Sequence, residues 1–242
     1  MFDRIKYKKF ARIQLKKRWT LPVLITLFCT IIISLLNIPD TSQQLVKFSD
    51  IMSEHGFNLT ITSMIPQPTG WLLYTYQLCS FLAILITEIL EIAQIKFYLK
   101  MSLSPEPVSF GDFIEGFSLW ARGILASLWV SLWTIIWTFL FIIPGIVKAY
   151  AYSMTLYLVA ENTELSITKA LKVSMAITKG HKMDLFILDL SFIGWSILCC
   201  FTAGIGYLWL VPYIQMTKVN AYHALLKEAL TTGLITVEDL KD

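Results

Sequence analysis

The chain has 242 residues, enough for one sizeable domain, and 56% of them are hydrophobic while only 15% are charged. Because an ordinary soluble domain is about 25% charged, this composition excludes a water-soluble globular fold and indicates a chain that lies in a lipid bilayer. The formal net charge of +3 decides little, since the positions of the charges along the chain carry the information.

Residues 1–18 form a basic arm that precedes an apolar stretch, Trp19–Ile38. This stretch is longer than the roughly 7–15 residues of a signal-peptide core, and no small-x-small cleavage pattern follows it. We therefore interpret it as a retained first span. The cations of the arm fit membrane insertion and attraction to anionic lipid, and no nucleic-acid-binding motif accompanies them, so we expect no nucleic-acid partner.

The sequence predicts an all-α, polytopic transmembrane bundle, because several stretches approach the ~20 apolar residues that a bilayer core requires. The tight junctions Pro144-Gly145 and Gly204-Ile205-Gly206 favour helical hairpins, since proline and glycine end helices. The fourth stretch rises only ~24 Å at 1.5 Å per residue, so it could instead be re-entrant. We expect one membrane domain over 19–226 and a cytoplasmic tail over 227–242. The six expected spans are 19–38, 71–99, 117–143, 145–160, 184–203 and 204–222.

The lysines and arginines gather on one side of this predicted topology. With both termini in the cytoplasm, eighteen of the twenty fall on the inner side, as the positive-inside rule requires. Only Lys47 and Lys148 fall outside, and Lys148 could extend its amino group to the outer surface.

Two segments between the spans carry separate expectations. The outer loop, 39–70, has apolar residues at helical spacing, which predicts a short surface helix, and its His55 reads as a solvated loop histidine. On the inner side, 166–180 predicts an amphipathic helix that lies among the lipid headgroups or else packs beneath the bundle as a connector. The candidate contacts to anionic headgroups are Lys169, Lys172, Lys179 and Lys182.

Polar residues within the expected spans mark a candidate intramembrane site, because such residues are costly in lipid and are commonly functional. In the second span Ser80, Thr87, Glu88, Glu91, Gln94 and Tyr98 fall on one helix face. Glu88 and Glu91 could bind a proton or cation, or could simply pair with Arg122 or Lys218. The full candidate set is Glu88, Glu91, Gln94, Asp189, Arg122 and Lys218.

The sequence contains no recognised catalytic or cofactor motif. HExxH, GxSxG and Walker A patterns are absent. The four cysteines lie in apolar runs without metal-ligand spacing, which favours a packing role. We therefore expect no enzyme activity, no cofactor and no metal site.

The second half of the chain resembles a family of uncharacterised bacterial integral membrane proteins, domain of unknown function nine hundred seventy-five. The resemblance covers roughly residues 110–226. It implies a six-helix fold in a bacterial plasma membrane and kinship with the membrane domains of some glycerophosphodiester phosphodiesterases, whose catalytic domain is missing from this sequence. The matching stretches are 143–154, 179–182, 185–186, 190–195, 204–209 and 211–213.

Two functions remain open from the sequence. The first is a non-enzymatic accessory or envelope-maintenance role in the bacterial cell membrane, with a basic inner face that contacts anionic lipid or a membrane-protein partner. The second is a small transporter or exporter with Glu88 and Glu91 as its coupling site. A membrane-bound lipid enzyme ranks third. A cavity that reaches Glu88, Glu91 and Asp189 would favour transport, whereas a solid apolar bundle would favour the accessory role.

Overall fold

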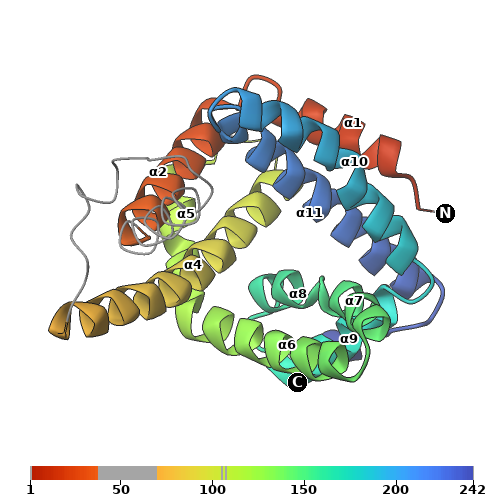
Figure 1. The fold of residues 1–242 in the computed structure, drawn as a ribbon. Coiled ribbons are helices and arrows are strands. Elements are labelled where there is room, and N and C mark those ends of the chain that lie inside the picture. Colours follow the sequence, from red (N-terminus) through yellow and green to blue (C-terminus); the bar gives the residue numbers. More distant parts are fainter. Residues whose placement is uncertain (1, 38–69, 105, 107, 242) are drawn as a thin grey trace. The chain divides into compact units, whose positions relative to one another are not determined.

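The computed structural model describes residues 2–37, 70–104, 106 and 108–241, and every element in these residues is a helix (Figure 1). The expected outer loop, with its surface helix and His55, lies outside the described residues. The helices are α1 (Arg4–Leu15), α2 (Thr20–Leu36), α4 (Trp71–Leu103), α5 (Phe110–Gly116), η2 (Phe117–Leu119), α6 (Trp120–Leu140), α7 (Ile142–Tyr152), α8 (Thr155–Glu161), α9 (Ile167–Ile177), α10 (Lys182–Phe201), α11 (Tyr207–Thr231) and η3 (Glu238–Leu240).

The chain divides into two compact units, one of Met1–Leu27 with Glu88–Asp242 and the other of Phe28–Thr87. Within the smaller unit the hydroxyls of Ser80 and Thr87 donate to the carbonyls of Tyr76 and Ala83, one turn back in α4. These two members of the predicted polar stripe therefore satisfy their hydrogen bonds inside their own helix. The candidate site and the apolar groove described below lie in the larger unit.

Four helical segments are long and apolar enough to cross a membrane, and a fifth span arises if the bent pair α1 and α2 counts as one. The four are 74–103, 110–140, 142–161 and 182–201, and the axes of α1 and α2 differ by 99°. Large apolar side chains point outward from them, with Phe139 91% and Phe201 84% exposed. Such surfaces suit lipid rather than water. The fold is thus all-helical with four candidate membrane spans, whereas α11, the expected sixth span, is not among them.

The hairpin between α6 and α7 turns at Phe141, three residues before the predicted Pro144. Phe141 adopts an extended backbone (φ −157°, ψ 135°), and Pro144 lies within the first turn of α7, where its missing N–H costs nothing. Gly145 serves close packing here: a Cβ at this position would lie 2.6 Å from the Cα of Thr138 on α6. The second hairpin follows the prediction, because Ala203 (φ 50°) and Gly204 (φ 83°) adopt left-handed backbones.

The expected fourth span is present as the single candidate span 142–161, and a local break at Ser153 and Met154 divides it into α7 and α8. At this break Ser174 of α9 accepts from the Met154 N–H (3.2 Å) and donates to the Ala151 carbonyl (2.8 Å). Thr178 of α9 also donates to Ala151 (3.3 Å). Because backbone groups in a membrane domain need internal partners, these hydroxyls allow the helix to break inside the fold.

Helix α9 packs its apolar face on protein. Ala170, Leu171, Val173 and Ile177 are at most 6% exposed, and α9 contacts α6, α7, α8 and α11. Of the two alternatives for this helix, the packing matches the connector beneath the bundle. The exposed lysines of its polar edge stay available to a surface.

The basic arm is a helix that packs along α11 rather than a free tail (Figure 1). Its buried edge consists of Tyr7, Ala11 and Leu15. Gln14 accepts from the amide of Asn220 (2.8 Å), which fixes α1 against the polar half of α11.

Candidate functional site

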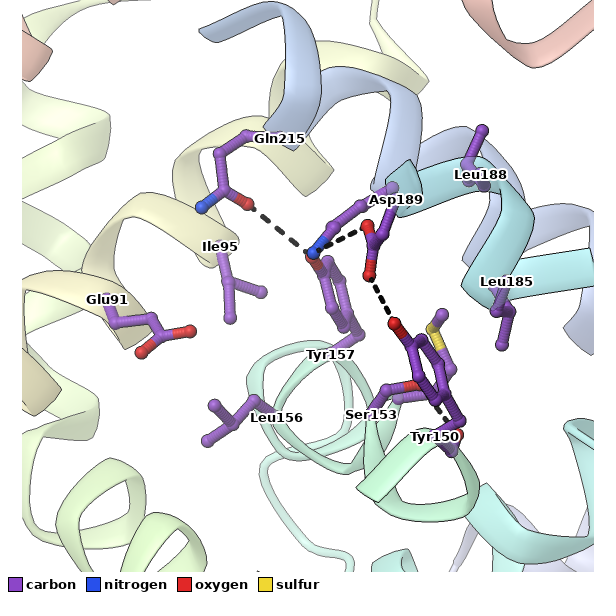
Figure 2. Close-up of a pocket in the computed structure, with 12 residues that line it drawn as sticks. Glu91, Ile95, Tyr150, Ser153, Leu156, Tyr157, Leu185, Leu188, Asp189 and Gln215 are labelled. Carbon is purple, nitrogen blue, oxygen red and sulfur yellow. Dashed lines mark hydrogen bonds and ion pairs between the residues drawn. The ribbon is translucent and has the colours of Figure 1, made fainter. Parts of the chain in front are cut away.

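A polar cavity of about 110 Å³ lies next to the break between α7 and α8 (Figure 2). Its volume is sufficient for several water-sized groups. Helices α4, α10 and α11 complete its wall. The polar lining residues are Glu91, Tyr150, Ser153, Tyr157, Asp189, Gln215 and Lys218.

An ion pair between α10 and α11 forms one side of the cavity. The Lys218 amino group lies 3.2 Å from an Asp189 carboxylate oxygen, and the other oxygen accepts from the Tyr150 hydroxyl at 3.4 Å. The Asp189 carboxylate therefore has two donor partners, the Lys218 amino group on α11 and the Tyr150 hydroxyl on α7. Both partners of the ion pair are about one-third exposed, so the pair stays accessible to a ligand in the cavity.

Glu91 faces this ion pair from α4 (Figure 2). Its carboxylate makes no hydrogen bond or ion pair with any residue in the part of the chain that the structure describes, although Lys218 and Glu88 both act on it through space. With all three groups ionised, the two carboxylates and one ammonium leave the cavity with one net negative charge. A proton or a small cation would neutralise it.

Three of the predicted site residues lie away from the cavity lining. Glu88 and Gln94 do not line it. Arg122 instead donates to the carbonyls of Asn162 (3.4 Å) and Leu165, which follow α8. Of the alternatives for Glu91, pairing with Arg122 or Lys218 is not seen, because the Arg122 guanidinium satisfies the end of a helix and Lys218 pairs with Asp189.

Four further polar residues of the cavity were not among the predicted site residues: Tyr150, Ser153, Tyr157 and Gln215. The Tyr157 hydroxyl donates to the Gln215 side-chain oxygen at 3.5 Å, and the Tyr157 ring stacks on Tyr222 at 5.5 Å. Tyr150 and Tyr157 look like ordinary apolar residues of a span in the sequence. Tyr150, Ser153 and Tyr157 stand at i, i+3 and i+7, so helical periodicity places them on one face, and this spacing was the available signal in the sequence.

The candidate lipid-contacting lysines differ in their surroundings. Lys172 and Lys179 are exposed, Lys182 is half-buried, and Lys169 donates to the carbonyl of Lys241 near the end of the chain. Lys148, expected to reach the outer surface, instead places its amino group 4.8 Å from the Trp137 ring centre and 4.0 Å from the Met175 sulfur.

His181, absent from the predicted site, bridges two carboxylates at the start of α10. Its ring nitrogens lie 3.1 Å from Asp184 and 3.3 Å from Glu228. Among the described residues, no three histidine, cysteine, aspartate or glutamate side chains converge as metal ligands.

The fold and the cavity together define a class: an α-helical membrane protein with a polar pocket beside a broken helix. Residues 140–229, which are less than half of the chain, match a family model described as Protein of unknown function (DUF975). The comparison with curated proteins and the comparison with solved structures each found no match. Tyr150, Tyr157, Asp189 and Lys218 fall inside the matching stretch, whereas Glu91 lies before it.

Proposed function

We propose that this protein is a small transporter that moves a proton or a small cation through the cavity at the break between α7 and α8. The observation that supports the proposal is Glu91, a carboxylate without a hydrogen-bond partner among the described residues, opposite the Asp189–Lys218 ion pair. Transporter sites commonly form at broken helices near the middle of the membrane. An intramembrane carboxylate is costly unless it binds a proton or cation during function.

The cavity limits the size of the solute. At about 110 Å³ it accommodates a proton, an alkali cation, ammonium or a methylated ammonium, but not a nucleotide or a whole lipid. The Tyr157 ring and the Tyr150 hydroxyl offer a cation both an aromatic face and an oxygen.

A flux assay in proteoliposomes tests the proposal. The full-length protein is reconstituted in vesicles that contain a pH-sensitive dye and have an acidic interior. Na⁺, K⁺ or methylammonium is then added to the outer solution. We expect at least one of these cations to release protons from the vesicle interior, which the dye reports as a rise in internal pH. Glu91→Gln should slow this release about ten-fold or more, because the charge that receives the cation is lost. Glu88→Gln removes a carboxylate one turn away that does not line the cavity, and it should retain the flux.

Equal flux from wild type and Glu91→Gln would contradict the coupling role, and so would an equal loss in Glu88→Gln. No flux with any of the three cations would also contradict it. That last outcome would favour the accessory role, in which the exposed Lys172 and Lys179 contact anionic headgroups or a membrane-protein partner.

We also propose a location and a topology for the chain. The resemblance to bacterial membrane proteins supports the bacterial cell membrane. The charge split of eighteen to two supports six spans with both termini in the cytoplasm.

A further inference from the structure

An apolar groove of about 440 Å³ lies where α1, α10 and α11 meet, apart from the polar cavity. Its walls include Trp19, Trp195, Cys199, Trp209 and Leu210. From Gly206 to Tyr213 along α11 the groove extends about 10 Å at 1.5 Å per residue. Among the residues that the structure describes, none of those that line the groove is acidic.

One end of this groove carries a cation. Arg12 of α1 donates through Nε to the Tyr213 hydroxyl at 3.1 Å, and its guanidinium lies 5.3 Å from the centre of the Tyr213 ring. Tyr213 thereby fixes one edge of the guanidinium. Its two terminal amino groups donate to no other residue in the described part of the chain, and the side chain is exposed. A guanidinium held in this way presents parallel donors that match a phosphate.

The surroundings of the groove favour lipid as its occupant. Trp195 and Trp209 are 52% and 50% exposed, and the neighbouring Leu198, Phe201 and Ile205 are more exposed still. Tryptophan is enriched where a membrane protein meets the headgroup region. An apolar channel with a cation at one end matches the two parts of an anionic phospholipid, a hydrocarbon chain and a phosphate.

We propose that this groove binds one acyl chain of an anionic phospholipid, with Arg12 on the phosphate. The site rests on α1 and the α10–α11 hairpin and is independent of transport through the polar cavity. It gives the basic N-terminal helix a specific role: Arg12 selects the headgroup, whereas Lys8 is held by the Ser191 carbonyl and the Phe192 ring of α10.

Titration of the full-length protein in detergent with phosphatidylglycerol or phosphatidylcholine, followed by native mass spectrometry, tests the headgroup. Wild type should hold one phosphatidylglycerol about five-fold more tightly than phosphatidylcholine, since one cation near a membrane surface contributes roughly that much. Arg12→Gln should lose the preference. Arg4→Gln removes the same charge from the same helix, away from the groove, and should keep it.

A second measurement locates the chain. Phosphatidylglycerol with brominated acyl chains should quench the tryptophan fluorescence of wild type, and the double variant Trp195→Phe with Trp209→Phe should lose a large part of that quenching. Unchanged quenching in the double variant would place the chain elsewhere.

Four other outcomes would overturn the site. If the wild-type protein bound phosphatidylglycerol and phosphatidylcholine equally tightly, Arg12 would not select the headgroup. An equal loss of the phosphatidylglycerol preference in Arg4→Gln would mean that the preference depends on general surface charge and not on Arg12. Competition by soluble glycerol phosphate as strong as that of the lipid would show that the groove contributes nothing, and a lipid-free dimer would assign the groove to a second copy of the chain.

Discussion

Gly145 and Gly206 stand beside the two hairpin turns and hold the helices of each hairpin close together. A Cβ on Gly145 would lie 2.6 Å from the Thr138 Cα, and one on Gly206 would lie 2.7 Å from the Cys199 sulfur. In each case the contacted residue stands seven positions earlier in the chain. The absence of a side chain therefore sets the distance between the two helices, since real Cβ atoms do not approach so closely.

Gly145→Ala should destabilise the protein by about 1–3 kcal/mol, because the backbone of α6 must move to admit the new methyl group. The matched control is Gly194→Ala in α10, where a Cβ would meet nothing within 4 Å. That change should leave stability unaltered or raise it by up to ~1 kcal/mol through helix propensity. Thermal unfolding in detergent measures both, and a Gly145→Ala protein as stable as wild type would contradict the close approach.

The site residues show how far the sequence alone could go. Glu91, Asp189 and Lys218 were predicted because ionisable groups in apolar helices are rare. Which of them form an ion pair was not predictable. Asp189 and Lys218 come from separate helices, and sequence periodicity does not determine how one helix is rotated against the other. Arg122 was misassigned for the same reason: its partners are backbone carbonyls, which leave no pattern in a sequence.

At the scale of elements, the break between α7 and α8 depends on hydroxyls from another helix. Ser174 satisfies both the Met154 N–H and the Ala151 carbonyl, and all of these groups are buried. No glycine or proline stands at Ser153 or Met154, so the sequence predicts a single short span here, and 142–161 is indeed long and apolar enough to be one span. The interruption inside this span was not predictable, because its cause, Ser174, lies twenty residues further along the chain.

Ser174→Ala should destabilise the protein by about 1–3 kcal/mol, since it leaves a buried N–H without its acceptor. Ser196→Ala is the control. The Ser196 hydroxyl donates only to the Phe192 carbonyl in its own helix, so its removal should change stability by less than about 0.5 kcal/mol. Chemical or thermal unfolding in detergent measures the difference. Equal effects from the two variants would mean that α9 does not support the break.

The turn at η3 should depend on pH through Asp239. This carboxylate accepts from the N–H and the hydroxyl of Thr236, both at 2.8 Å, and the hydrogen bond from the Thr236 backbone lowers the pKa of Asp239 most. A lowered folded-state pKa means that the turn is stabilised above the unfolded value of about 3.9 and loses that support as the pH falls through the folded value.

The backbone amide signal of Thr236, followed by NMR from neutral to acidic pH, measures this change. It should move as the pH falls below about 4. Asp239→Asn should abolish the pH dependence, whereas Glu238→Gln, a neighbouring exposed carboxylate, should leave it intact. A pH response that survives Asp239→Asn would assign it to another group.

The α6–α7 and α10–α11 hairpins can be compared as the two halves of a possible internal repeat in the sequence. Alignment of Gly145 with Gly206 places Tyr152 opposite Tyr213, which predicts two similar hairpins. The shared close approach seven residues back agrees with that pattern. The turns differ, however, because Phe141 is extended while Ala203 and Gly204 are left-handed.

For the whole molecule, the all-helical membrane class was predictable and the number of spans was not. Composition and the length of the apolar runs require a bilayer. The weak point is α11, whose later half carries Gln215, Lys218 and Asn220. Protein groups partner each of these side chains: Gln14 of α1 pairs with Asn220, Tyr157 of α8 with Gln215, and Asp189 of α10 with Lys218. A length and hydropathy test omits such a helix, since it measures composition and not what covers the side chains.

The parity of the span count decides the position of the C-terminus. If α11 crosses, six spans leave both termini in the cytoplasm. If it does not, Lys218, Lys227 and Lys241 move to the outer side, and the charge split of eighteen to two becomes 18 − 3 = 15 to 2 + 3 = 5. The positive-inside rule disfavours that arrangement. Reporter fusions after Thr163, after Ala203 and at the C-terminus measure the outcome. We expect cytoplasmic signals from the first and third and an external signal from the second, whereas an external C-terminus would reduce the fold to five spans.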